Sequence, residues 1–306
     1  MKKEIFTINS SVDGLPLSVM SIEPDSQPVK GVVQIVHGMA EMKERYINFM
    51  NFLADNGYAS IIHDHRGHGQ SVHAKDDLGH MYGAGGNGLV EDTCCITQEA
   101  KKRWPHVKLT LMGHSMGSLV VRCYAKKYDD QIDALIVMGC PARNGAVGFA
   151  QLLVSILKKF KGSRHKSHFI NNAAFASYSK GIENPRTDFD WLSVNTDNVD
   201  FYLDNEYCGF IFTLDGFKGL FDVQKDCYDS HNWQMKNPSL PVIFLSGEMD
   251  PCIGSRAKFD EAINFMKERG YSNIQEHFYK NMRHEILNED DHMLVCNDIL
   301  QWLEAH

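Results

Sequence analysis

One short stretch of this sequence has the residue types and the spacing of a reactive serine. Ser115 lies at the centre of 113–117, which reads Gly-His-Ser-Met-Gly and matches the pattern G-x-S-x-G. A mostly apolar run at 107–112 predicts a short buried strand before it, and a helix is expected from Met116 to about residue 127. Strand, sharp turn and helix in this order are the context in which such a turn exposes a nucleophilic serine hydroxyl.

A serine hydroxyl is a weak nucleophile, so it needs a base and a group that orients this base. Asp250 follows a predicted strand at 240–246, and His284 follows a predicted strand at 274–279. Either residue alone has an ordinary interpretation, as a solvated loop acid or as a surface histidine. However, the carboxyl ends of parallel strands meet at one edge of a sheet, and serine, acid, histidine is the expected order along the chain. We therefore predict a triad of Ser115, Asp250 and His284.

The elements that must position these residues alternate along the chain. A hairpin turn is predicted at Asp13-Gly14, between strands at 4–10 and 15–22. Helical segments separate further buried strands, which are predicted at 31–36, 58–63 and 132–139. This alternation indicates an α/β fold, a mostly parallel sheet with helices on both faces.

Two local patterns carry further predictions. The glycine-rich run at 83–88 lacks the Lys-Ser/Thr of a phosphate loop, so we interpret it as a loop before a helix that begins near Leu89. Asn288 is predicted to cap a final helix. Acidic groups suit the first turn of a helix, and three occur there: Glu289, Asp290 and Asp291.

The middle of the chain breaks the alternation of strands and helices. Residues 141–221 contain helical patches, loops and aromatic residues but no strand-like run. A segment of this length is more than a connection between two core strands. We predict that 141–221 forms an inserted helical cap, and that 1–140 and 222–306 form the core domain.

One predicted helix of this cap has a pronounced apolar face over residues 149–160. Leu153, Ile156 and Leu157 belong to it, and several lysines follow or interleave. We consider two interpretations: a helix that packs on the core, or a face that lines an acyl-binding channel or touches lipid with a basic fringe. Under the second interpretation, these three residues contact the substrate.

The motifs around the predicted site resemble a known family. Four runs are similar to the monoacylglycerol lipase and lysophospholipase branch of the α/β-hydrolases, within the serine aminopeptidase-like hydrolase group. The runs are 37–41 (His-Gly-Met-Ala-Glu), 64–71 (Asp-His-Arg-Gly-His-Gly-Gln-Ser), 113–117, and 283–287 (Arg-His-Glu-Ile-Leu). The resemblance extends from about residue 30 to the C-terminus and is weakest in the middle. It implies hydrolysis of monoacylglycerol or lysophospholipid esters without a cofactor.

Attack on a carbonyl creates an oxyanion that needs preorganised donors. The backbone N–H of Met116 is one expected donor. By its place in the family pattern, the N–H of Met39 is the other, and Gly38 allows the backbone a close approach. The alternative is that 37–39 is an ordinary tight turn between a strand and a helix.

Composition limits the classes of protein and of partner. The chain has 306 residues, 43% hydrophobic and 23% charged, which is ordinary for a globular protein. Its net charge of −8 argues against a nucleic-acid partner. It shows neither a long apolar span nor a signal peptide, and its eight cysteines lack C-x-x-C spacing. We expect a cytoplasmic protein with reduced thiols, a small ester or lipid substrate, and transient membrane contact, if any, through the cap.

Two histidine-rich motifs could suggest a metal, but neither fits. The run 63–68 has three histidines around Asp64 without the spacing of a dinuclear hydrolase, and we interpret it as a structural turn that carries Arg66. His284-Glu285 begins like H-E-x-x-H, but Asn288 stands where the second histidine of a zinc protease is required. We predict no metal site and no cofactor.

Three other functions deserve comparison. A cap-bearing serine aminopeptidase of the same fold would use acidic cap residues to hold a substrate amine, and Glu183 and Glu206 are available without a diagnostic pattern. A dehalogenase would have aspartate at position 115. A non-catalytic binding protein on this fold would usually lack a triad residue.

Overall fold

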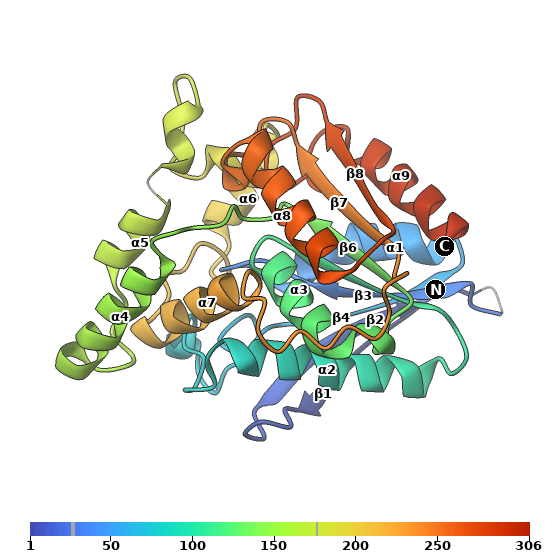
Figure 1. Ribbon diagram of the computed structural model, residues 1–306, viewed down its shortest axis with the longest axis horizontal. Helices are drawn as coiled ribbons and strands as arrows, with labels where there is room; N and C mark the ends of the chain where they lie inside the picture. Colours follow the sequence, from blue (N-terminus) through green and yellow to red (C-terminus); the bar gives the residue numbers. More distant parts are fainter. Residues whose placement is uncertain (26–27, 176) are drawn as a thin grey trace.

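The computed structural model describes residues 1–25, 28–175 and 177–306. Within these residues the core is an eight-stranded sheet in the order β1-β2-β4-β3-β5-β6-β7-β8 (Figure 1). The strands are β1 (Lys2–Asn9), β2 (Pro16–Glu23), β3 (Gly31–Val36), β4 (Tyr58–His63), β5 (Leu109–His114), β6 (Ala134–Met138), β7 (Val242–Gly247) and β8 (Ile274–Tyr279). The hairpin β1-β2 is antiparallel, and β2 runs antiparallel to β4. All pairs from β4 to β8 are parallel, which confirms the predicted mostly parallel sheet.

The register of the parallel strands brings their carboxyl ends to one edge. Val36 of β3 is opposite Gly113 of β5, and His114 of β5 is opposite Met138 of β6. At the far side of the sheet, Gly247 of β7 is opposite Tyr279 of β8. The loops that follow β3, β5, β7 and β8 therefore start from the same edge, as the predicted triad requires.

Helices cover both faces of the sheet, and the central strands are therefore buried on both sides. On β5, Leu111 and Met112 point to opposite faces, so each belongs to a different hydrophobic cluster. The elements packed on Met112's face are η1 (Lys43–Tyr46), α1 (Ile47–Asp55) and α9 (His292–Ala305). Those on Leu111's face are α2 (Gly85–Arg103), α3 (Met116–Tyr128), α7 (Leu214–Asp226) and α8 (Arg256–Arg269).

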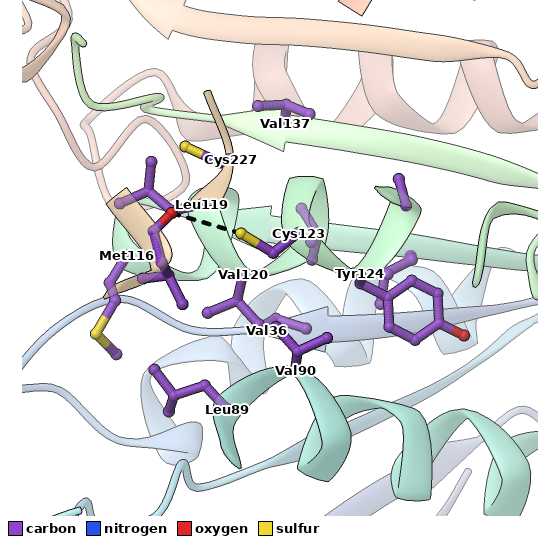
Figure 2. Packing of buried hydrophobic residues seen from close by; sticks show 14 of the residues in the cluster. Val36, Leu89, Val90, Met116, Leu119, Val120, Cys123, Tyr124, Val137 and Cys227 are labelled. Carbon is purple, nitrogen blue, oxygen red and sulfur yellow. Dashed lines mark hydrogen bonds between the residues drawn. The ribbon is translucent and has the colours of Figure 1, made fainter. Parts of the chain in front are cut away.

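Helix α3 is held firmly between the sheet and α2. Figure 2 shows Val120 of α3 beside Val36 of β3 and Val90 of α2, all three in the same buried cluster. Cys123 of α3 donates to the backbone oxygen of Val223 in α7, at 3.4 Å. The helix that follows Ser115 is therefore fixed on three sides.

The segment between β6 and β7 is helical in its described part. It contains α4 (Val147–Lys161), α5 (His168–Phe175), η4 (Tyr178–Gly181), η5 (Asp190–Leu192), α6 (Thr196–Asp204) and α7. Figure 1 shows α4 and α5 at one end of the molecule, next to α7. Of the predicted cap 141–221, residue 176 lies outside the described residues. The predicted boundary at 221 falls inside α7, whose Phe217 and Val223 belong to the main core cluster.

The glycine-rich run does not form the predicted loop before a helix at Leu89. Helix α2 begins at Gly85, so three of the glycines are in its first turn. A Cβ at Gly86 would lie 2.9 Å from the backbone nitrogen of Val223, and one at Gly88 would lie 2.9 Å from Nε of Arg66. The glycines thus allow the helix to approach α7 and a buried arginine closely, and this packing outweighs their low helix propensity.

The predicted start of the last helix is also wrong. Helix α9 begins at His292 after Asp291, and no side chain caps it. Glu289 lies before the helix, and its carboxylate accepts hydrogen bonds from the backbone of Arg283 and Val194 and from the hydroxyl of Ser193. Several hydrogen bonds to a buried carboxylate stabilise the fold more than the interaction of this carboxylate with a helix dipole would.

Three short 3₁₀ turns complete the secondary structure: η2 (Lys75–Asp77), η3 (Asp129–Gln131) and η6 (Pro251–Ile253). No described helix combines the length and the apolar character needed to cross a bilayer.

Candidate functional site

Ser115 sits at a strained turn between β5 and α3. Its φ is 54° and its ψ is −118°, a conformation that costs free energy for a residue with a side chain. A Cβ at Gly117 would collide with the carbonyl oxygen of Val36, and one at Gly113 would collide with the carbonyl oxygen of Gly117. Only glycine fits at both positions, and the Ser115 N–H donates to the Met138 carbonyl at 3.0 Å. This is the geometry that the G-x-S-x-G pattern requires.

Asp250 and His284 are brought together by the loops after β7 and β8. Nδ1 of His284 lies 2.9 Å from Oδ2 of Asp250, and both residues are buried. The Asp250 carboxylate also accepts from the Cys252 N–H at 2.8 Å and from the Ser246 hydroxyl at 3.3 Å. These bonds fix the carboxylate so that it orients the imidazole.

The protonation of His284 is set by two opposing effects. Burial favours the neutral imidazole, but the adjacent Asp250 carboxylate and its hydrogen bond outweigh burial and raise the pKa of His284. The opposite nitrogen, Nε2, is buried without a hydrogen-bond partner in the described part of the chain. Buried polar atoms normally have a hydrogen-bond partner, so this nitrogen is available to bind a hydroxyl group.

His284 lies next to the imidazole of His114, the residue that precedes Ser115. The His114 and His284 ring centroids are 4.7 Å apart. A Cβ built on Gly38 would lie 3.2 Å from Cβ of Ser115 and 3.4 Å from Cδ2 of His114. The structure thus gathers all three predicted triad residues at one edge of the sheet.

The two predicted oxyanion donors are the backbone N–H groups of Met39 and Met116, which belong to the turns after β3 and β5. Met116 is the first residue of α3, so its N–H has no partner within the helix. Across 1–25, 28–175 and 177–306, neither this N–H nor that of Met39 donates to a protein acceptor. The turn after Met39 is held by Ala40, which has a φ of 51°, donates to Nε2 of His68 at 3.2 Å and accepts from Gly209.

A buried charge network that the sequence did not predict surrounds this edge. Arg45 donates to Glu285 at 2.6 and 2.5 Å, to Glu41 at 2.9 Å and to the Asn198 side chain at 2.9 Å. Glu41 in turn accepts from the Gly38 N–H at 2.5 Å. The network therefore joins the turn of Met39, the residue after His284, and helix α6 of the predicted cap.

The two carboxylates of this network are not equivalent. Burial alone would raise the pKa of Glu285, but its paired contact with Arg45 lowers it to about 2. For Glu41, burial raises the pKa, and the contact with Arg45 only partly opposes this because Glu285 is also close. Glu285 is thus the firmly ionised partner. A signal for both existed, since Glu41 ends the 37–41 motif and Glu285 follows His284, but nothing in the sequence paired them with Arg45.

Residues of the predicted cap complete the surroundings of His284. The Trp191 ring lies 5.1 Å from the His284 ring, and the Tyr178 ring lies 4.9 Å from Trp191. The Arg283 guanidinium donates to the carbonyl oxygens of Asp190 and Ser193, which ties this part of the cap to the histidine loop. The 3₁₀ turn that contains Trp191 therefore covers the imidazole.

The structure separates the three residues predicted to line an acyl site. Leu153 and Leu157 of α4 are half-buried and pack against the main core cluster. Ile156 is 44% exposed and lies near Phe149 and Phe160 in the sequence, which are 69% and 84% exposed. Helix α4 thus has a packed side and an apolar side open to solvent.

The histidine-rich run 63–68 makes contacts of a structural turn. Asp64 forms a buried ion pair with Lys43 at 2.7 Å, and Arg66 pairs with Asp92 at 2.7 Å. The His63 and His65 side chains are buried among these groups. Elsewhere in the described residues, one group has metal-ligand chemistry and spacing: ligand atoms of Asp250, Cys252 and His284 lie within 4.8 Å of one another.

Known proteins are similar to this chain in sequence and in fold. A family model described as Serine aminopeptidase, S33 matches residues 27–291. A monoacylglycerol lipase from Mycolicibacterium smegmatis is 25% identical over 291 residues, which cover 92% of this chain and 91% of the relative. These findings confirm the predicted resemblance to monoacylglycerol lipase-like α/β-hydrolases.

Solved structures agree on the fold. A highly thermostable carboxyl esterase from Bacillus coagulans, in complex with glycerol, superposes with a TM-score of 0.90 at 20% identity, covering 100% of this chain and 99% of the other. A soluble variant of the monoglyceride lipase from Saccharomyces cerevisiae, with a substrate analogue, gives a TM-score of 0.75 at 21% identity, covering 100% of this chain and 97% of the other. At these identities, the likeness establishes the α/β-hydrolase fold.

Proposed function

The chain belongs to the serine aminopeptidase S33 family of α/β-hydrolases, and we propose that it is a carboxylic ester hydrolase that works through an acyl-enzyme. The observation that carries the proposal is that a strained serine turn and a buried aspartate–histidine pair lie at the same edge of the sheet. Ser115 is the nucleophile, His284 is the base, and Asp250 orients His284 and stabilises its charged form.

The mechanism follows from the two nitrogens of His284. Its Nδ1–H is held by Asp250, so Nε2 is free to take the proton of the Ser115 hydroxyl as this oxygen attacks the ester carbonyl. The imidazolium then gives that proton to the leaving alcohol. A water molecule, deprotonated by the same Nε2, releases the acid and restores Ser115.

The developing oxyanion is stabilised by the backbone N–H groups of Met39 and Met116. Both are free of protein acceptors in the part of the chain that the structure describes, and one belongs to the N-terminal turn of a helix. Preorganised donors of this kind act on the transition state more than on the neutral ester.

The proposed substrates are esters with one long acyl chain, such as monoacylglycerols or lysophospholipids. The similarity to the monoacylglycerol lipase of M. smegmatis along most of the chain supports this class. Leu153, Ile156 and Leu157 of α4 remain the proposed acyl contacts, with Leu153 and Leu157 on its packed side and Ile156 at its exposed side.

We further propose that α4 makes transient contact with a membrane surface. Its exposed apolar side chains have a basic fringe, which suits the interface of an anionic bilayer. The apolar side chains are Phe149, Leu152, Ile156 and Phe160, and the fringe includes Lys159 and Lys161. The eight free cysteines fit a reducing compartment, so we propose a cytoplasmic location.

Labelling with a fluorophosphonate, together with turnover of p-nitrophenyl esters, tests the nucleophile. Wild-type protein is expected to take up one label, and Ser115→Ala is expected to lose it together with about 10⁶-fold in turnover, the scale known for serine triads. Asp250→Asn should keep the fold but lower turnover by about 10⁴-fold, because it favours the wrong imidazole tautomer.

Normal labelling of Ser115→Ala would contradict the assignment of the nucleophile. An aminoacyl arylamide assayed beside the esters tests the aminopeptidase alternative. Of the two acids considered for an amine site, Glu206 is exposed and paired with Lys75, so it offers no support for that alternative. Faster cleavage of the arylamide than of any ester would nevertheless establish it.

A further inference from the structure

Cys252 lies directly beside the Asp250–His284 pair and has no part in the mechanism above. It is the middle residue of the 3₁₀ turn η6, and its N–H donates to Oδ1 of Asp250 at 2.8 Å. Among the described residues, its buried thiol makes one weak hydrogen bond, with the hydroxyl of Tyr178 at 3.5 Å. The backbone therefore fixes this residue next to the carboxylate.

Three different ligand types converge at this point. Ligand atoms of Asp250, Cys252 and His284 all lie within 4.8 Å of one another, and all three residues are buried. Zinc takes sulfur at about 2.3 Å and histidine nitrogen at about 2.0–2.1 Å, and a three-residue set leaves a fourth position open. For all three to bind one ion, the side chains must rotate so that these atoms move closer together.

The charge around this cluster also favours a cation. The Asp250 carboxylate lies 2.9 Å from Nδ1 of His284, so a negative charge already faces the place that the ion would take. The ligand set selects the kind of cation, because thiolate and imidazole prefer borderline and soft ions, whereas Mg²⁺ and Ca²⁺ require oxygen ligands.

We propose that Cys252, Asp250 and His284 form an inhibitory site for a thiophilic divalent cation such as Zn²⁺ or Cd²⁺. The binding stands on the geometry of the three residues, whereas its inhibitory effect rests on the proposed hydrolase function.

The chemistry of binding explains why hydrolysis stops. The ion bonds to Sγ of Cys252, whose proton goes to water, and to a carboxylate oxygen of Asp250. It also bonds to Nδ1 of His284, so the proton on that nitrogen must move to Nε2. With Nε2 protonated, His284 remains neutral but cannot accept the proton of Ser115. The ion thus imposes the same wrong tautomer as loss of the orienting aspartate.

Two measurements on the full chain test the site. The first is the Zn²⁺ concentration that halves p-nitrophenyl acetate turnover, expressed relative to the metal-free rate of each variant. The second is the charge-transfer absorption of a cadmium–thiolate bond on addition of Cd²⁺, which needs no activity. Wild-type protein should be inhibited by Zn²⁺ but not by Mg²⁺, should recover with a chelator, and should show the cadmium absorption.

Variants of the thiol identify the ligand. Cys252→Ser and Cys252→Ala should raise the inhibitory Zn²⁺ concentration by at least about tenfold and lose the cadmium absorption. Loss of a residue that only hydrogen-bonds a metal ligand already lowers metal affinity by about tenfold or more, so loss of a ligand should cost at least as much. Cys296→Ser is the matched control, since Cys296 is also buried but belongs to α9. It should behave as wild type. Tyr178→Phe removes only the weak contact of the thiol and should retain inhibition.

Equal Zn²⁺ sensitivity of Cys252→Ala and wild type, or a cadmium absorption that persists in both Cys252 variants, overturns the site. A wild-type protein that shows the Cys252-dependent absorption but hydrolyses no ester would instead contradict the proposed function and leave the metal site standing. The residual ester turnover of each variant shows that it has folded.

Discussion

Buried histidines behind the serine turn make the folded state sensitive to acid. Burial and the nearby Arg66 lower the pKa of His63 to about 3, and burial lowers that of His68 to about 4. In the unfolded chain both pKa values return to about 6.5. Below that pH the unfolded state binds protons that the folded state does not, so stability falls as the pH drops from 6.5 towards 4.

At pH 5 the loss from each of these histidines is roughly 2 kcal/mol, since one pKa unit is worth about 1.4 kcal/mol. Urea unfolding at pH 7.5, 6 and 5 measures it. His63 is the best site to substitute because neither of its ring nitrogens has a hydrogen-bond partner among the described residues. His63→Leu should flatten the pH dependence. A variant whose stability falls as steeply as that of wild type would show that His63 does not stay neutral when buried.

At the scale of elements, the Glu41–Arg45–Glu285 network positions the turn that carries Met39. The Glu41 carboxylate accepts from the Gly38 N–H at 2.5 Å and from Arg45 at 2.9 Å. Glu41→Ala should therefore lower kcat by up to about 10²-fold, the lower range for loss of one oxyanion donor, with little change in KM. Glu41→Gln keeps an acceptor for Gly38 and should restore most of kcat. Equal loss in both variants, or a loss confined to KM, would argue against positioning.

Helix α4 offers a separate test of substrate class. If its apolar side contributes to binding of the acyl chain, each buried CH₂ should add up to about 0.8 kcal/mol, or roughly fourfold in kcat/KM per carbon. Ile156→Asp should then depress hydrolysis of long-chain monoacylglycerol in anionic vesicles much more than hydrolysis of soluble p-nitrophenyl acetate. Ser155→Asp places the same charge at an exposed neighbouring position and serves as the control. Parallel losses on both substrates in Ile156→Asp alone would mean that the position matters only for packing.

At the scale of the whole molecule, the sequence predicted the parts that depend on local pattern. The strands at 31–36, 58–63 and 274–279 match the structure to the residue. The first two are mostly apolar and buried, and the third has the mixed polar and apolar residues of a strand at the edge of a sheet. The Asp250–His284 contact also followed from strand order. The pairing of Arg45 with Glu285 did not, because a contact between residues 240 positions apart leaves no periodic signal. Likewise, glycines predicted to form a loop entered α2 because a neighbouring helix required their small size.

A buried carboxylate, that of Glu289, links the predicted cap to the loop after β8. It accepts from the Ser193 hydroxyl at 2.5 Å and from the N–H groups of Val194 at 2.9 Å and Arg283 at 2.7 Å. Two of these donors belong to the cap and one belongs to the loop that carries His284. Removing the carboxylate would leave buried donors unpaired, and each unpaired group costs about 1–3 kcal/mol.

Glu289→Ala should therefore lower the free energy of unfolding by about 2–4 kcal/mol and accelerate amide exchange across 190–198 before it affects the central strands. Esterase turnover should fall with it, because Arg283 is adjacent to His284, the proposed base. Glu268→Ala removes a carboxylate that is 68% exposed on α8 and should change stability by no more than about 0.5 kcal/mol. If exchange in 190–198 stayed at the wild-type rate while the protein as a whole became less stable, Glu289 would support the core alone, and the cap would be held to it by other contacts.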